Sequence, residues 1–120
     1  MNLHPTEIAF LKDLARARAH WTSVATEAVQ NPHDLIWSDH GADWLKLSES
    51  IKRTGSEDVF SVAVAELLSG LIHSVLVSLA GGTALAETTR LEIRDDDGYE
   101  LKRFLHEFWP EYENQSGEEA

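Results

Sequence analysis

The sequence predicts a mainly α-helical fold. It has three to four helices around a buried central helix (about 58–80), a small β-hairpin (about 89–101) and a short C-terminal helix. Three observations predict this fold. Residues 59–80 are almost uniformly apolar, and the residues before them repeat apolar side chains every three or four positions. The residues after them alternate polar and apolar side chains and then reach a turn. We expect residues 1–112 to form one domain, because 120 residues is an ordinary domain size.

The first helix is expected to begin at Pro5 and to end near Val29. Proline is favoured at the first helical position, and Glu7 follows in the first turn, where the helix dipole stabilises a carboxylate. Apolar residues then recur at spacings of four and three: Phe10, Leu14, Ala17, Trp21, Val24 and Ala28. Asn31-Pro32 is a typical end signal for such a helix.

The second helix is expected to begin at Asp39 or Gly41 and to end at Gly55, a residue suited to a left-handed cap. The loop before it carries three apolar residues that we expect to fill the side of the core: Leu35, Ile36 and Trp37. Ser56 then caps the central helix, and the glycines at 81–82 end it. A surface helix has a polar side. The central helix has none, so we expect it to be buried on every side.

Residues 90–94 alternate polar and apolar side chains, a pattern typical of a strand. Asp97-Gly98 is a strong hairpin dipeptide, so a return strand is expected through Leu101. The sequence leaves open whether this hairpin pairs within one chain or between two chains through its edge. A short helix limited by Pro110 is expected next, and residues 113–120 are expected to form a solvated acidic tail.

The chain is strongly acidic, with 21 acidic and 10 basic residues and a net charge of −11. Twelve of the acids and only four of the bases lie in residues 61–120. We expect no direct binding to nucleic acid, because such binding needs clustered lysine and arginine. An acidic surface indicates either solubility alone or a basic partner protein attracted by charge. The absence of cysteine excludes disulfides and thiolate metal sites.

Residues 59–80 have the length of a membrane span. Glu66, His73, Gly70 and four serines interrupt the segment, and its flanks lack aromatic and basic anchors. We therefore expect a buried helix and no association with a membrane. A cytoplasmic location is expected as well, since the N-terminal residues show no pattern of a signal peptide.

No catalytic residue, metal site or cofactor is predicted, and we expect a protein that is not an enzyme. Glu66 and His73 share a side of the central helix, and together with His106 they are the candidate residues for a small enzyme. The alternative to such a site is that His73 is a core residue whose ring nitrogens are hydrogen-bonded and that Glu66 lies at the helix edge. Residues 95–98 resemble half of a calcium loop, but the pattern then requires an acid six residues after the glycine, where this chain has Phe104.

A group of acids and aromatic residues near the C-terminus is the predicted partner-binding surface. Its members are Asp95, Asp96, Asp97, Glu107, Trp109, Glu111 and Tyr112. Tryptophan and tyrosine are enriched at binding hot spots, and a rim of acids suits a basic partner. The alternative is that Trp109 folds back and closes the core.

The segments Leu71–Glu87, Asp95–Gly98 and Leu101–Trp109 resemble small bacterial proteins. In size, acidity and lack of catalytic motifs, the chain is similar to immunity proteins of bacterial toxin systems and to small phage-encoded inhibitors of host defence. The resemblance implies a non-enzymatic inhibitor that occludes a basic or nucleic-acid-binding surface of a toxin or defence effector. The residues also permit a structural or regulatory helical module that forms a homodimer, because the apolar helix and four tryptophans exceed what one thin helical layer buries.

Overall fold

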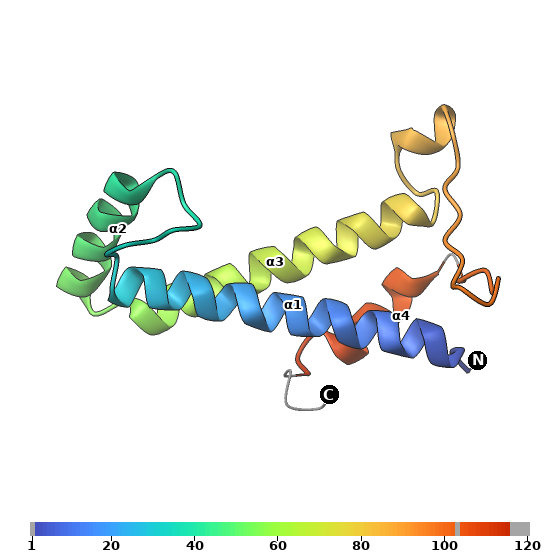
Figure 1. Cartoon of the computed structure of the whole chain (residues 1–120), viewed down its shortest axis with the longest axis horizontal. Helices are drawn as coiled ribbons and strands as arrows, with labels where there is room; N and C mark the ends of the chain where they lie inside the picture. The colour runs from blue at the N-terminus through green and yellow to red at the C-terminus, as the bar shows by residue number, and fades with distance from the viewer. Residues whose placement is uncertain (1, 103, 116–120) are drawn as a thin grey trace.

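A computed structural model describes residues 2–102 and 104–115. Its elements are α1 (Pro5–Gln30), α2 (Gly41–Thr54), α3 (Glu57–Leu79), the 3-10 turn η1 (Ala84–Glu87) and α4 (Leu105–Tyr112). The long helices α1 and α3 pack against each other, α2 packs at one end of this pair, and α4 packs against both long helices towards the other end (Figure 1). The mainly helical character predicted from the sequence is confirmed.

Local signals set the helix ends. The His4 ring accepts a hydrogen bond at Nδ1 from the Thr6 backbone N–H (3.1 Å), and the Glu7 carboxylate accepts one from the His4 backbone N–H (2.7 Å). This reciprocal pair satisfies backbone donors that the first turn leaves free. Gly55 ends α2 with a φ of 63°, a left-handed conformation that glycine adopts without steric cost. The first three helices therefore lie within a few residues of their predicted limits.

The main core lies where α1, α3, α4 and the segment before α4 meet. Its buried side chains are Leu11, Ala15, Leu76, Leu101, Leu105 and Trp109. A smaller cluster joins α1 to α2, where Val29 and Ile51 are buried and the Ser48 hydroxyl donates a hydrogen bond to the Val29 carbonyl. Removal of these apolar groups from water stabilises the helix contacts.

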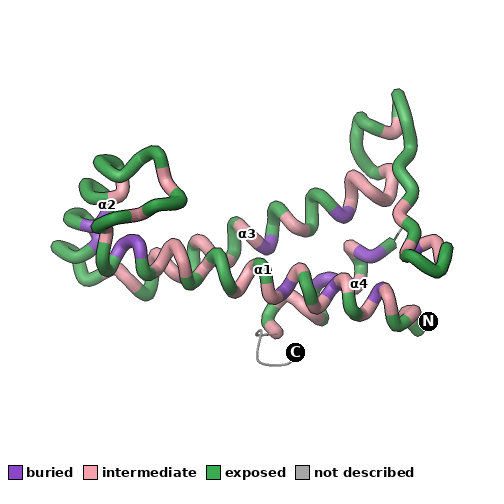
Figure 2. The backbone as a smooth tube through the Cα atoms, in the orientation of Figure 1, coloured by how far each residue is buried: buried purple, intermediate pink, exposed green. Residues whose placement is uncertain are grey.

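The prediction that α3 is buried on every side is wrong. Only Ser69 and Leu76 are buried among its residues, as the short purple stretches of α3 in Figure 2 show. Five of its large apolar side chains are between 50% and 73% exposed: Val59, Val62, Leu67, Leu71 and Val75. Within the chain, the helices that pack on α3 leave one of its sides open to solvent. Uniform apolarity gives no indication of which side of a helix the rest of the chain covers.

The molecule is open in shape. Its Cα radius of gyration is 17.4 Å, whereas a compact domain of this length has a radius of about 14 Å. Its accessible surface is 8033 Å², against about 6,500 Å² for a compact monomer of 13.4 kDa. Figure 1 shows α1 and α3 diverging towards the C-terminal end of α3. The chain thus leaves exposed a surface that a compact domain of its mass would bury.

The predicted β-hairpin at about 89–101 is also wrong. Residues 2–102 and 104–115 contain no strand, and a single antiparallel bridge pairs Arg94 with Glu100. The turn between them is nonetheless formed, with Gly98 at a φ of 85°. The dipeptide signal therefore located the turn but not a ladder of paired strands.

Pairing stops after this one bridge: the Asp95 N–H donates to the Tyr99 carbonyl and the Leu101 N–H to the Ile93 carbonyl (both 2.9 Å), while side-chain carboxylates accept from other backbone donors of the segment. Asp95 Oδ1 accepts from the backbone N–H groups of Asp97 (3.0 Å) and Tyr99 (2.9 Å). Glu7 Oε2, from α1, accepts from the backbone N–H of Lys102 (2.6 Å). Backbone groups satisfied in this way need no partner strand. The segment is consequently fixed to α1 instead of extending into a hairpin.

Two local predictions fail as well. Pro110 lies inside α4 instead of limiting it, at the cost of the backbone donor that proline lacks. Ile36 is 98% exposed and does not fill the core. Trp37 lies beside it and packs edge-to-face against Trp21 and Trp44, with ring centroids 6.1 and 5.5 Å apart. The loop is thus held by aromatic contacts with α1 and α2.

Candidate functional site

One side of α3 forms a continuous exposed surface, here called the α3 face. It consists of Val59, Val62, Ala63, Leu67, Gly70, Leu71, Ser74 and Val75. These positions recur at helical spacing, so they follow one side of a helix of 23 residues, which is roughly 34 Å long. Soluble monomers seldom expose a contiguous apolar patch larger than a few hundred Å². The α3 face is therefore a candidate for contact with another surface.

Polar contacts on the opposite side of α3 fix its orientation; we call them the polar clamp. The Trp109 indole N–H donates to the Ser69 carbonyl (3.2 Å) and hydroxyl (3.0 Å), and that hydroxyl donates to the Glu113 carboxylate. Arg18, from α1, donates through Nε to the Ala65 carbonyl (3.0 Å) and through Nη1 to the Glu113 carbonyl. The clamp joins α1, α3 and α4, so α3 cannot rotate its exposed side inward without breaking buried hydrogen bonds.

Two ionisable residues, Glu66 and His73, border the α3 face, and both are exposed. The His73 ring meets the His106 ring of α4 edge-on, with centroids 5.7 Å apart. An open groove of about 640 Å³ between α3 and α4 includes Glu66, His73 and Trp109 in its lining. The groove extends the α3 face towards α4. Glu66 and His73 are in contact with solvent along this groove.

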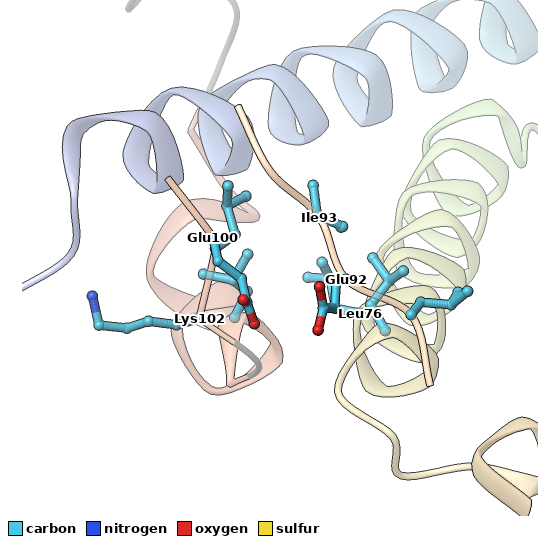
Figure 3. A pocket seen from close by; sticks show the side chains of 9 residues that line it. Leu76, Glu92, Ile93, Glu100 and Lys102 are labelled. Atoms are coloured by element: carbon cyan, nitrogen blue, oxygen red, sulfur yellow. The ribbon is translucent and has the colours of Figure 1, made fainter. Parts of the chain in front are cut away.

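A small enclosed cavity lies near the C-terminal end of α3 (Figure 3). Leu76, Ile93, Leu101 and Lys102 are among the residues that line it, and its volume is about 20 Å³. A volume of this size holds about one water molecule, whereas a pocket for a small organic ligand measures about 300–1,000 Å³. The cavity is therefore a packing defect of the core and no substrate pocket.

The predicted partner-binding residues do not form one exposed surface. Four of them are exposed: Asp96, Asp97, Glu107 and Glu111. Asp95 and Tyr112 are partly buried, and Trp109 is only 1% exposed. The side chain of Trp109 completes the core, which is the alternative that the sequence left open. The exposed part of the predicted partner-binding surface is therefore acidic and contains no tryptophan.

Asp95 has a structural role in the turn. Its Oδ2 accepts a hydrogen bond from the Thr6 hydroxyl of α1 (2.7 Å). This bond, together with the bonds from the Tyr99 and Asp97 N–H groups, holds the pKa of Asp95 below its ordinary value. The carboxylate oxygens of residues 95–97 lie within 4.8 Å of one another, and the tight turn accounts for that proximity.

Sequence reasoning missed the role of Glu7, which was predicted only as a first-turn acid of α1. Its side chain is fully buried, and its carboxylate also accepts a hydrogen bond from the Lys102 ammonium (3.0 Å). Burial raises the pKa of Glu7, but the bonds from the Lys102 and His4 N–H groups and from the ammonium lower it by more, so it lies below its ordinary value. The hydrogen bond from the Lys102 ammonium to Glu7 in turn raises the pKa of Lys102. Glu7 thus anchors the segment before α4 to the start of α1.

Comparison of the chain with protein-family models, with curated proteins and with solved structures finds no match. A function must therefore be argued from the surfaces and contacts of this chain.

Proposed function

We propose that this protein is a non-enzymatic helical module that binds another protein through the α3 face. The observation that carries the proposal is the 50–73% exposure of five large apolar side chains on a helix whose rotation the polar clamp prevents. Each Å² of apolar area removed from water by a partner contributes about 25 cal/mol to association. The open surface favours a macromolecular partner over a small ligand, and the enclosed cavity near the C-terminal end of α3 holds only about 20 Å³.

A protein partner is favoured over a lipid bilayer. Residues Glu57–Glu87 are long and apolar enough to cross a membrane by length and composition. However, Glu66 and His73 interrupt the segment, and the polar clamp ties it to α1, a helix with many charged side chains. A helix that lies on a membrane surface usually has a basic rim, whereas this chain carries a net charge of −11. A cytoplasmic location is part of the same proposal.

Site-specific photo-crosslinking tests the proposal. We expect a photo-reactive amino acid in place of Leu71 to form a covalent adduct with another polypeptide in the native host, because this side chain lies 61% exposed in the middle of the α3 face. The matched control places the same amino acid at Lys46, an exposed position of α2, where no adduct is expected. Equal labelling at both positions, or none at Leu71, would contradict a binding role for the α3 face.

The exposed acids favour a second candidate function, inhibition of a basic partner. Asp96, Asp97, Glu107 and Glu111 are solvent-exposed, and the whole chain has a net charge of −11. In this function the acidic surface covers a basic or nucleic-acid-binding surface of a toxin or defence effector, and charge complementarity accelerates the encounter. The mechanism is steric and electrostatic occlusion without chemistry.

Reversing the charge of Asp96 and Asp97 tests this second candidate. We expect Asp96→Lys with Asp97→Lys to abolish the low-salt retention of a basic partner from lysate of the native host, and to reduce the loss of binding at high salt. Asp95 is left unchanged because its hydrogen bonds hold the turn. Glu49→Lys with Asp43→Lys, on exposed positions of α2, is the matched charge control. Retention that both double variants reduce equally would assign the effect to net charge alone.

A further inference from the structure

We propose that the α3 face binds a second copy of this chain, with the two α3 helices antiparallel about a two-fold axis near residues 69–70. This inference rests on the proposed function, because it names the partner of the same surface. Three features of the molecule carry it: an unexplained glycine, the spacing of two ionisable residues and the amount of uncovered surface.

The first feature is Gly70, in the middle of the exposed side of α3. A Cβ built at this position meets nothing within 4 Å, so no contact inside the chain requires glycine here. Glycine in a helix interior is destabilising relative to alanine. Ala63, Leu67, Gly70 and Ser74 are spaced four, three and four residues apart, which is the spacing of a coiled-coil seam. Small residues on a seam let a second helix approach closely, and a helix from another chain would explain this glycine.

The second feature is the separation of Glu66 and His73 by seven residues, which places them at equivalent flanking positions of successive heptads. Equivalent flanking positions meet each other across an antiparallel pair. Each Glu66 then faces the partner's His73, and the two-fold axis repeats this contact. In a parallel pair the Glu66 carboxylate would face the partner's Leu71 instead. An imidazole N–H can donate a hydrogen bond to the carboxylate and a leucine side chain cannot, so the antiparallel arrangement is favoured.

The third feature is area. The accessible surface of 8033 Å² exceeds the about 6,500 Å² of a compact monomer of this mass by more than about 1,000 Å². A specific interface between two copies buries about 1,000 Å² or more in total, which is about 500 Å² from each chain. The excess of one chain, to which the α3 face contributes, thus exceeds its share of such an interface.

The test is the molar mass in solution, measured by sedimentation between about 1 and 200 μM, a range that resolves micromolar Kd values. We expect the wild type to dimerise and Leu67→Glu to raise Kd by about 100-fold or more, because each chain would bury an unpaired carboxylate at the seam. Leu67 is 73% exposed, so helicity by circular dichroism is expected to be retained. Ile36→Ser removes a 98% exposed apolar side chain outside the α3 face and is the matched control.

Charge exchange tests the antiparallel register. Glu66→Lys and His73→Glu are each expected to raise Kd by about tenfold, and the double variant is expected to return it to within about threefold of the wild type. His73→Glu alone places two carboxylates opposite each other, whereas the double variant restores an attractive pair. A dimer without this rescue would overturn the antiparallel arrangement.

The outcomes separate this inference from the proposed function. A wild type that remains monomeric at about 200 μM overturns self-association. If the Leu71 photo-adduct then contains a different protein, the proposed function stands with another partner. Binding of the monomer to vesicles of phosphatidylcholine and phosphatidylglycerol, lost in Leu67→Glu, would overturn both and assign the α3 face to a membrane. A dimer that Leu67→Glu and Ile36→Ser leave equally intact would place the interface elsewhere.

Discussion

Replacement of Trp109 by alanine is expected to lower the free energy of unfolding by about 4 kcal/mol. The indole is 1% exposed and lies in the core between α1, α3 and α4. Its removal leaves a large cavity and also deprives the Ser69 carbonyl of a donor. Urea denaturation followed by circular dichroism measures the change, since the method does not depend on tryptophan fluorescence.

Trp109→Phe is the matched control for this substitution. Phenylalanine retains most of the apolar volume but lacks the indole N–H that donates to Ser69. We expect a smaller loss, about 1–2 kcal/mol, because one buried hydrogen-bond partner is removed while the core stays largely filled. A loss below about 1 kcal/mol for the alanine variant would contradict a core role and return Trp109 to the partner-binding surface.

Replacement of Glu7 by alanine is expected to destabilise the protein by about 3 kcal/mol, because the backbone N–H of Lys102 would lose its buried acceptor. The pKa of Glu7 lies below the ordinary value of 4.5, so the folded state favours the ionised carboxylate. The stability it contributes is complete above about pH 4.5 and is lost as the pH falls through the lower, folded-state pKa. Asp95 acts in the same direction below its ordinary value of 3.8.

Urea denaturation of the wild type and of Glu7→Gln between about pH 3 and 7 measures this dependence. We expect the wild type to be more stable at neutral pH and the difference between the two proteins to shrink on acidification. Glu49→Gln, an exposed α2 position, is expected to follow the wild type at every pH. Parallel curves for Glu7→Gln and the wild type would show that the Glu7 carboxyl does not titrate with folding.

The limits of α1, α2 and α3 could be predicted because local chemistry sets them. Pro5 has the φ angle that a first helical turn needs, Asn31-Pro32 cannot continue a helix, and Gly55 adopts a left-handed conformation. Each signal acts within a few residues of its own position. A sequence read from end to end therefore contains the information directly.

The wrong predictions share one cause, which is that distant residues decide the outcome. The turn at Gly98 is local and formed, but Glu7, 95 residues before Lys102, holds the residues after the turn against α1. Likewise, apolar periodicity identifies the sides of α3 that avoid water, while the open side depends on where α1 and α4 lie. No pattern within residues 59–80 carries that information.

The candidate site was predictable only in part. The excess of apolar surface over what one helical layer buries was evident from the sequence, and the exposed α3 face agrees with it. The sequence could not say which side of α3 would be open, because Arg18 and Glu113 fix that orientation from opposite ends of the chain. The contact of Arg18 with the Ala65 carbonyl joins positions 47 residues apart, so no local pattern predicts it.

The long separation of the fixing contacts affects how the protein is made. Thr6 bonds to Asp95, Glu7 to Lys102 and Arg18 to Glu113, across 89, 95 and 95 positions of the chain. α1, α2 and α3 are synthesised before the residues that fix them. Until α4 docks, α3 exposes its α4-facing side in addition to the α3 face, and transiently exposed apolar surface favours aggregation. Completion of the fold thus requires the docking of α4 onto helices that are far from it in the sequence.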